Sequence, residues 1–242
     1  MKGFTKLALD IAMGAVVPIL ILTNLTRPLG APTAYVLAAL APVLYVLADT
    51  LFISRRFNVI TTYIALSAII NGVLAFWFVD GVRFALKDTA AITVSVVVIA
   101  VSIAIGKPLV QYFLIQALNP DTPARTAKLK ALLALPAVRR SVVWATWLVL
   151  LEGVAAGIIN IALNLSIVTA LFGTESFNQQ VAHVNAITRI GFPIASLAAF
   201  GIGLTFVFRA LYAALPKEER EAQTDGDIWS LIDLWQPGLE AG

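Results

Sequence analysis

The sequence predicts an all-α membrane protein, a polytopic bundle of six transmembrane helices with its N-terminus and C-terminus in the cytoplasm. Composition is the first reason: 60% of the residues are hydrophobic and 13% are charged, whereas soluble domains carry about 25% charged residues. The second is that the hydrophobic residues form long uninterrupted runs, and a helix needs about 20 of them to cross a bilayer. The predicted spans are residues 7–25, 33–53, 59–79, 90–106, 142–172 and 186–215.

The distribution of Lys and Arg between these runs is the third reason, and it predicts the orientation. Cytoplasmic loops of membrane proteins carry an excess of these residues. With the N-terminus inside, 13 of the 17 basic residues lie on the cytoplasmic side. The outer four are Arg27, Arg83, Lys87 and Arg189. We therefore predict a multi-pass protein of the bacterial inner (cytoplasmic) membrane.

The connections divide the predicted bundle, residues 1–215, into two halves. Residues 26–32 and 54–58 are short links, which force consecutive helices to run antiparallel. Residues 107–141 form a much longer, basic cytoplasmic loop. Three spans precede this loop and three follow it, so the halves would be inverted, as in many transporters.

Two outer links, residues 80–89 and 173–185, are longer than the other outer link. The first is mixed in charge, and the second has no Lys or Arg. The second link holds Glu175 and His183. We predict His183 as a surface side chain, with a pH-sensitive contact to Glu175 as the alternative.

Part of the cytoplasmic loop, residues 124–135, is amphipathic and basic. Leucines at positions 129, 132 and 133 oppose basic residues at positions 125, 128 and 130. Such a segment beside a membrane commonly lies in the interface and senses anionic lipid. We therefore predict an anionic-lipid contact over residues 124–140, with an ordinary solvated loop as the alternative.

Residues 216–242 form an acidic cytoplasmic tail with two basic and seven acidic residues, a net charge of 2 − 7 = −5. Residues 227–236 are predicted as a short amphipathic helix that Asp227 caps. Because anionic lipid repels an acidic helix, we expect it to dock on the basic face of the bundle or on a protein partner. Its apolar face comprises Ile228, Leu231, Ile232 and Trp235.

Glu152 is the acidic residue predicted nearest the middle of a span. It lies about 15 Å along the fifth helix, where burial away from water favours the protonated form. Asn160 and Asn164 follow near the same side of that helix, and Asn71 lies at a comparable depth on the third. One hypothesis is a path for protons or a polar solute along these four side chains. The alternative is structural hydrogen bonding between helices, worth about 0.6 kcal/mol per bond.

Four ionisable residues are predicted at one depth in the cytoplasmic third of the bundle. Ionisable side chains inside a span cost about 2.5–3.5 kcal/mol on insertion scales. Two acids and two bases at one depth can neutralise one another, so we predict an ion-paired layer that locks the helices together. A cytoplasmic gate or ion site is the alternative. The four residues are Asp10, Asp49, Lys107 and Arg209.

Several chemistries are excluded by what the sequence lacks. It contains no Cys and one His, which leaves no thiolate or multi-histidine metal site and no bis-histidine haem. It also offers no Ser–His pair or His–carboxylate cluster for catalysis. Basic and aromatic residues are not interleaved as nucleic-acid binding requires. We therefore predict a protein that is not an enzyme and has no cofactor, metal or nucleic-acid partner.

Small residues recur at every fourth position on the last two predicted spans. Such stripes let helix backbones approach closely. They predict packing within the bundle, with a homodimer interface as the alternative. The stripes are Gly153 and Gly157 on the fifth span, and Gly191, Ala195, Ala199 and Gly203 on the sixth.

The end of the fourth span reads S-I-A-I-G-K-P-L-V-Q-Y-F (Ser102–Phe113). It resembles an S-L-x-x-G-R-P-L-x-x-Y stretch in uncharacterised bacterial six-helix inner-membrane proteins distantly related to the intracellular septation protein A family. This chain has Lys107 where that family usually has Arg, and it adds the acidic tail. The resemblance implies a polytopic inner-membrane protein linked to envelope maintenance and septation, without an established reaction. Further matching features are Asn24 to Pro28, Arg55, Arg56, Trp144 and Glu152.

Two functions fit these observations, of which we predict the first and keep the second as the alternative. The first is a non-enzymatic integral membrane protein of the bacterial cell envelope that acts as a scaffold or organiser of partner proteins or lipid. The resemblance, the acidic tail and the small-residue stripes favour it. The second is a small secondary transporter or channel for protons or a small polar solute, which Glu152, the asparagines and the inverted halves favour.

Overall fold

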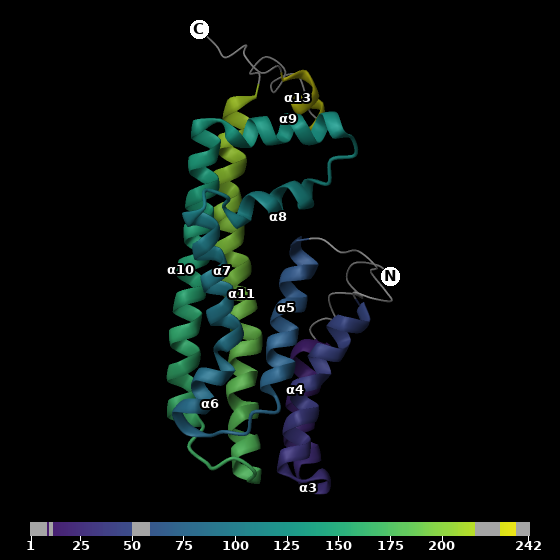
Figure 1. Cartoon of the computed structure of the whole chain (residues 1–242), viewed down its shortest axis with the longest axis vertical. Coiled ribbons are helices and arrows are strands. Elements are labelled where there is room, and N and C mark those ends of the chain that lie inside the picture. The colour runs from purple at the N-terminus through teal and green to yellow at the C-terminus, as the bar shows by residue number, and fades with distance from the viewer. Residues whose placement is uncertain (1–8, 10–11, 50–58, 216–227, 236–242) are drawn as a thin grey trace. The chain divides into compact units, whose positions relative to one another are not determined.

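The structure is a computed structural model that describes residue 9 and residues 12–49, 59–215 and 228–235. These residues form helices joined by short connections, and no β-strand occurs among them (Figure 1). The predicted all-α fold class is therefore confirmed for the described part of the chain.

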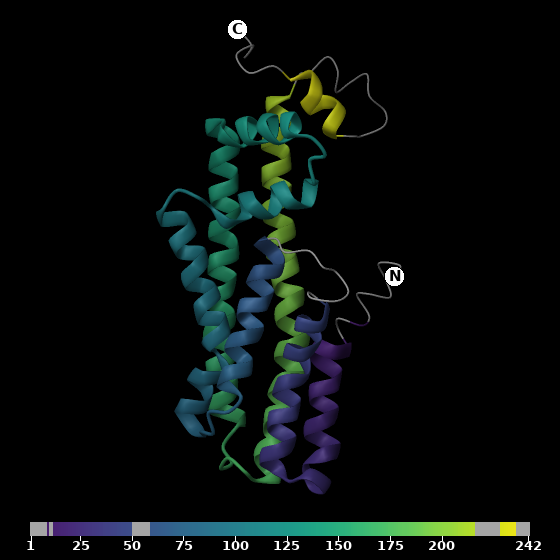
Figure 2. The same ribbon diagram turned by 45° about the vertical axis from the view of Figure 1, so that its right-hand side comes forward.

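The chain folds into two compact units. Unit 1 comprises Met1–Val97 and Glu152–Ser196, and unit 2 comprises Val98–Leu151 and Leu197–Gly242. Their boundaries fall inside three long helices, so each of these helices supplies residues to both units (Figure 2). The three are α7 (Ala90–Ala104), α10 (Pro136–Ile167) and α11 (Glu175–Ala214).

Unit 1 begins with a helical segment that contains π-helical stretches. Pro18 lacks a backbone N–H, so it cannot donate to the helical hydrogen-bond pattern. The π-helical stretches lie on either side of α2, which contains this proline. The segment ends at Gly30, whose φ of +80° favours glycine. The predicted link over residues 26–32 is therefore shorter than expected, with Gly30 alone outside a helix. The segment comprises η1 (Ala12–Val16), α2 (Val17–Leu20), η2 (Ile21–Leu25) and α3 (Thr26–Leu29).

The next two helices, α4 (Ala31–Ala48) and α5 (Val59–Leu74), pack against each other. A Cβ atom on Gly72 would lie 3.2 Å from Val43 Cγ1, so the close approach depends on the missing side chain. α5 ends before the predicted residue 79 because a turn begins there, in which the Trp77 N–H donates to the Leu74 carbonyl at 3.0 Å. Residues 50–53 of the second predicted span lie outside the described residues.

The predicted outer link over residues 80–89 is helical rather than irregular. It forms α6 (Gly81–Asp88), which meets α7 at a bend of 46°. Phe84 and Ala85 are fully buried and give this short helix an apolar anchor. Thr89 occupies the bend, and its Oγ1 donates to the Ala85 carbonyl at 2.8 Å.

The G-K-P-L motif forms the turn that ends α7 in unit 2. Gly106 has a φ of +69°, a conformation that L side chains rarely adopt. The Lys107 N–H donates to the Ser102 carbonyl at 2.8 Å, and the Leu109 N–H donates to Ser102 Oγ at 3.1 Å. The Ser and Gly of the motif therefore have a structural role in closing this turn.

Unit 2 continues with α8 (Leu109–Leu118) and α9 (Pro123–Ala134), and α13 (Ile228–Leu234) packs on α9. The predicted loop over residues 107–141 is thus largely helical. Thr122 caps α9, since its Oγ1 accepts from the Arg125 N–H at 3.1 Å. One apolar core joins these helices to α10 and α11, and its buried members include Leu129, Leu132, Val142, Leu211, Leu231 and Ile232.

α10 and α11 are longer than the spans predicted over residues 142–172 and 186–215. α10 already begins at Pro136. α11 begins at Glu175 because Thr174 Oγ1 accepts from the Phe177 N–H at 3.2 Å. The predicted link over residues 173–185 therefore moves to residues 168–174.

Four helical segments are long and apolar enough to cross a bilayer, and the bent pair α6–α7 would make a fifth. Only 11% of the apolar window of α11 is buried within the chain, and Leu197 on α11 is 71% exposed. Apolar surface of this extent needs lipid or a partner to cover it, which indicates a multi-pass membrane protein. The four segments are Ala12–Leu29, Ala31–Ala48, Pro136–Ile167 and Glu175–Ala214.

The small-residue stripes pack unevenly. A Cβ on Gly153 would lie 3.1 Å from Val96 Cγ2, so this stripe faces α7 within unit 1, as packing within the bundle predicts. In unit 2, a Cβ on Gly203 would lie 3.0 Å from the Ala145 Cβ. Apart from its own helix, no described residue lies within 4 Å of a Cβ built on Gly191. The homodimer interface stays a prediction.

Candidate functional site

The most polar part of unit 1 is built around Asp88, the last residue of α6. Asn160 and Asn164 of α10 donate their Nδ2 groups to Asp88 Oδ2 at 3.0 and 2.9 Å. Asn160 Nδ2 also donates to Thr89 Oγ1 at 2.9 Å. The two asparagines are 3% and 2% exposed. Spaced four residues apart on one helix, they hold the carboxylate in place from one side.

A second charged group, Arg189, enters from α11. Its Nε donates to Asn185 Oδ1 at 3.1 Å, one helical turn earlier on the same helix. Its Nη1 donates to the Gly14 carbonyl of η1 at 2.7 Å. Arg189 is half-buried and Asn185 is buried. These two bonds fix the direction of the guanidinium.

A third charge, Lys87, is almost completely buried, with 4% of its surface exposed. Its Nζ donates to the Trp77 carbonyl at 2.6 Å and lies 4.7 Å from the centroid of the Tyr35 ring. A carbonyl and an aromatic face both favour the ammonium form. The ammonium group of Lys87 therefore already has interaction partners within the protein.

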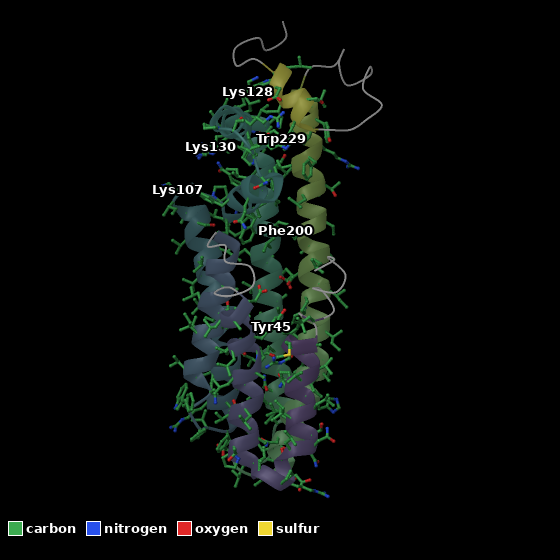
Figure 3. The ribbon with its side chains drawn as sticks, turned by 90° about the vertical axis from the view of Figure 1, so that its right-hand side faces the viewer. Tyr45, Lys107, Lys128, Lys130, Phe200 and Trp229 are labelled. Carbon is green, nitrogen blue, oxygen red and sulfur yellow. The ribbon has the colours of Figure 1, made fainter. Side chains whose placement is uncertain are left out.

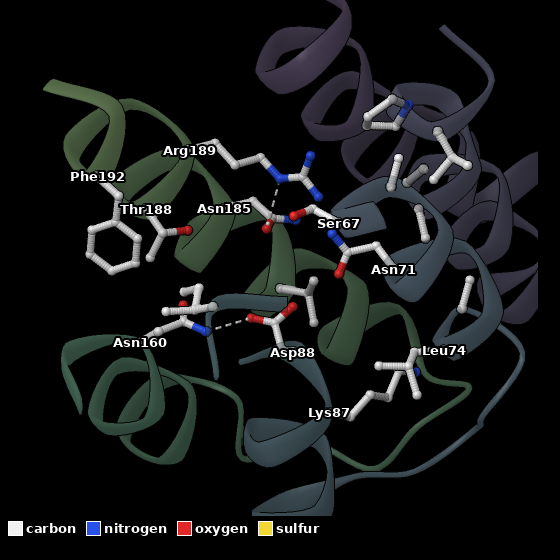
Figure 4. A pocket seen from close by; sticks show the side chains of 18 of the residues that line it. Ser67, Asn71, Leu74, Lys87, Asp88, Asn160, Asn185, Thr188, Arg189 and Phe192 are labelled. Atoms are coloured by element: carbon white, nitrogen blue, oxygen red, sulfur yellow. Dashed lines mark hydrogen bonds between the residues drawn. The ribbon is translucent and has the colours of Figure 1, made fainter. Parts of the chain in front are cut away.

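These three residues line one cavity of about 400 Å³ in unit 1 (Figure 4). This volume lies in the range of about 300–1,000 Å³ that is typical of small-molecule sites. Its polar side chains come from α4, α5, α6, α10 and α11, and apolar side chains, many of them from α4, complete the wall. The polar lining comprises Tyr35, Ser67, Asn71, Lys87, Asp88, Asn160, Asn185, Thr188 and Arg189.

Asp88 and Arg189 have opposite charges but do not form a salt bridge. Within the described part of the chain, no Lys or Arg nitrogen lies within 4.0 Å of the Asp88 carboxylate. Figure 4 shows both side chains directed into the same cavity. Both residues are half-buried, and charges that are partly removed from water without direct pairing cost stability, so this arrangement suggests a role other than stability.

Several polar groups of the lining have no hydrogen-bond partner among the described residues. On the charged residues they are the Oδ1 atom of Asp88 and the Nη2 atom of Arg189. The neutral ones are the side-chain amide of Asn71, the Tyr35 hydroxyl, Asn160 Oδ1 and Asn185 Nδ2. None of these atoms is sealed from the cavity. The lining therefore presents a free acceptor, a free cationic donor and a free amide to whatever occupies the space.

The predicted polar path is brought together only in part. Asn71 and Asn160 line the cavity, and Asn164 stands behind Asp88. Glu152 does not line it: its Oε1 accepts from Ser196 Oγ of α11 at 2.9 Å. The three asparagines thus gather around Asp88 rather than around Glu152.

The predicted inner ion-pair layer stays a prediction. Asp10 lies outside the described residues. Asp49 follows the end of α4 in unit 1, where its N–H donates to the Tyr45 and Val46 carbonyls. Lys107 and Arg209 belong to unit 2, and both are exposed, with no salt bridge among the described residues.

The contact considered between Glu175 and His183 does not form. Glu175 Oε1 instead accepts from Arg27 Nε at 2.8 Å and from Gln179 Nε2 at 3.0 Å. His183 lies on α11 with an exposed side chain, as predicted. A pH-sensitive pair at this end of unit 1 is therefore not supported.

Sequence reasoning missed Asp88, Lys87 and Arg189 as members of a site. All three were assigned to outer links or span ends, where charge is ordinary. A usable signal was the four-residue spacing of polar residues, Asn160 with Asn164 and Asn185 with Arg189, because it places each pair on one helix face.

Unit 2 carries its charges on the outside of an apolar core. Arg125 of α9 donates to both carboxylate oxygens of Asp233 on α13, with Nε at 3.2 and 3.0 Å. These bonds and the charges of Arg125 and Lys128 lower the pKa of the Asp233 carboxyl. Arg125 also lies 5.4 Å from the Trp229 ring, and Lys128 donates to the Asp233 carbonyl. Lys128 and Trp229 are labelled in Figure 3. The tail helix thus docks on its own chain.

The chain matches no family model, no curated protein and no solved structure. The resemblance to the septation protein A family accordingly stays a prediction from the motif.

Proposed function

We propose that the chain is a multi-pass protein of the bacterial inner membrane that binds a small polar solute in the cavity of unit 1 and carries it across the membrane. The main support is that two oppositely charged residues, Asp88 and Arg189, line a cavity of about 400 Å³ without forming a salt bridge with each other. Helices that line this cavity include ones long and apolar enough to span a bilayer. Ionisable groups at such positions are rare and mark solute or ion pathways.

The predicted topology is part of this proposal. The orientation with both termini in the cytoplasm follows from the basic residues of α9 and of the start of α10, which the excess of Lys and Arg in cytoplasmic loops assigns to the inner side. Six spans are part of the proposal, since the described residues contain four candidate spans, or five with the bent pair α6–α7. In this orientation Asp88 and Arg189 belong to the outer half of the membrane. The cavity would then be an outward-facing or occluded binding position of a secondary transporter.

A scaffold that organises partner proteins or lipid is the second candidate. Lys130, Arg139 and Arg140 are exposed in unit 2, which supports the anionic-lipid contact proposed over residues 124–140. The tail helix gives less support, because α13 is already docked on α9 of the same chain. A scaffold also has no need of a cavity lined by unpaired charges, so we favour transport.

Solute flux into proteoliposomes containing the full chain tests this proposal. Labelled alanine, lactate, choline and sorbitol represent a zwitterion, an anion, a cation and a neutral solute. We expect at least one to enter faster than into protein-free liposomes. Asp88→Asn and Arg189→Gln should each slow that entry about tenfold or more, since each removes a charged hydrogen-bonding group.

Glu152→Gln is the matched comparison, because it also neutralises a carboxylate in a predicted span. We expect it to leave the flux within about twofold of wild type, since Glu152 lies outside the cavity lining and glutamine keeps a side-chain oxygen that can accept from Ser196. Loss of flux in Glu152→Gln alone would instead favour the path predicted along Glu152. No flux of any probe, with folded protein, would contradict transport.

A further inference from the structure

We propose that the solute held in the unit 1 cavity is a small zwitterion that carries a carboxylate and an ammonium group, as a free amino acid does. This inference rests on the proposed function and names its substrate class. It starts from the two charged residues of the lining that keep an unpartnered polar atom, Asp88 and Arg189, with the amide of Asn71 beside them in the lining.

The anionic end of such a solute is recognised by Arg189. Two of its nitrogens are fixed by Asn185 and the Gly14 carbonyl, at 3.1 and 2.7 Å. The third, Nη2, is free, and a guanidinium N–H that is already oriented binds a carboxylate with little loss of side-chain entropy. Arg189 therefore provides a built position for one carboxylate oxygen.

The cationic end is recognised by Asp88. Its Oδ2 is occupied by two amide donors at 3.0 and 2.9 Å, while Oδ1 is open. Because both amides approach one oxygen, the carboxylate cannot turn away without breaking them. An ammonium group that donates to Oδ1 would form a direct ion pair with Asp88. No described Lys or Arg forms such a pair with it.

A solute with a single charge leaves one of the two residues unsatisfied. An anion would pair Arg189 but add a negative charge to the cavity that contains Asp88. A cation would pair Asp88 but add a positive charge beside Arg189. Lys87 adds a second positive charge to the lining, but its Nζ already donates to the Trp77 carbonyl and faces the Tyr35 ring, so the hydrogen-bonding groups left open on charged residues are those of Asp88 and Arg189. The zwitterion satisfies both free charges at once.

Binding to the wild-type full chain tests this inference without any substitution. The probes are alanine, leucine and glutamine, each as the free amino acid, the amide that lacks the carboxylate, and the N-acetyl derivative that lacks the ammonium. Stabilisation of the detergent-solubilised protein against thermal unfolding is read from tryptophan fluorescence. We expect a free amino acid to act at concentrations about tenfold or more below its two derivatives.

Variants then identify which residue binds the carboxylate end of the solute and which binds its ammonium end. Arg189→Gln should remove the discrimination against the amide, and Asp88→Asn should remove the discrimination against the N-acetyl derivative. Asn71→Ala, which breaks no hydrogen bond among described residues, should weaken the free amino acid while leaving the folded protein unchanged. Arg27→Gln and Asp80→Asn are charge-matched controls outside the cavity lining, and both should bind as wild type does.

The outcomes separate this inference from the proposed function. Tightest binding of an N-acetyl derivative or of an amide would overturn the zwitterion while leaving a solute site in place. If none of these probes binds but lactate, choline or sorbitol is transported, the zwitterion is likewise overturned and the proposed transport function stands. No binding and no flux would overturn both proposals. Equal discrimination in Arg189→Gln, Asp88→Asn and wild type would mean that the zwitterion binds elsewhere.

Discussion

Unit 1 and unit 2 place their charges in opposite ways. In unit 1, Lys87, Asp88 and Arg189 line a cavity and are held by amides, carbonyls and an aromatic ring. In unit 2, the core is apolar, and the ion pairs of Arg125 lie outside it. Buried charges without direct partners are expensive, whereas exposed pairs cost and contribute little. The difference is why we place the proposed binding site in unit 1, whereas unit 2 is held together chiefly by packing.

The largest effect is expected in the core of unit 2. Leu132 of α9 is 0% exposed and packs in the cluster that joins α9 and α13 to α10 and α11. Leu132→Ala should lower the free energy of unfolding by about 2–5 kcal/mol, through lost apolar burial and the cavity left behind. Chemical denaturation followed by tryptophan fluorescence measures this. The control Leu197→Ala, on an exposed leucine of unit 2, should have a much smaller effect.

In unit 1, two asparagines of the same cavity should differ in their effect on stability. Asn160→Ala removes one of the two amide donors to Asp88 Oδ2 and the donor to the buried Thr89 Oγ1, and it should cost about 1–3 kcal/mol. Asn71→Ala removes an amide with no partner among the described residues and should stay within about 0.5 kcal/mol. Equal losses in the two variants would contradict the division of the lining into structural and free groups.

Close helix packing in unit 2 can be tested by adding one methyl group. Gly203→Ala places a Cβ 3.0 Å from the Ala145 Cβ and 3.2 Å from its Cα. This overpacking should cost about 1–3 kcal/mol. Gly201→Ala on the same helix meets no atom within 4 Å and should stabilise α11 slightly, because alanine favours helix over glycine. The melting temperatures of the two variants should therefore shift in opposite directions.

The smallest effect is expected from the exposed ion pair of unit 2. Hydrogen bonds from Arg125 lower the pKa of Asp233 below its ordinary value of 3.8. The contact therefore stabilises the docked α13 fully above that ordinary value, and the stabilisation is lost as the pH falls through the lower pKa of the folded state. Fluorescence of Trp229 and Trp235 against pH measures it. Asp233→Asn should abolish this pH dependence, and high salt should weaken the contact in wild type.

The sequence by itself determined the all-α class and the presence of apolar helices long enough to span a membrane. It also identified Asn71, Asn160 and Asn164 as unusual. These features follow from local properties. One is the hydropathy of about 20 consecutive residues, and the other is a polar side chain within a span, where an apolar side chain would cost less free energy. Helix ends were less well predicted, since α6 and the start of α11 depend on burial of Phe84 and on the Thr174 cap.

Only the tertiary structure decided which polar residues meet. Asp88 lies in the predicted outer link over residues 80–89, and Arg189 lies about 100 residues later. Their shared cavity therefore depends on which helix faces turn toward each other. The same packing left Glu152, the leading candidate by depth, paired with Ser196. Depth in a span is a property of one helix, whereas a binding site is a property of several, and no local pattern encodes their mutual rotation.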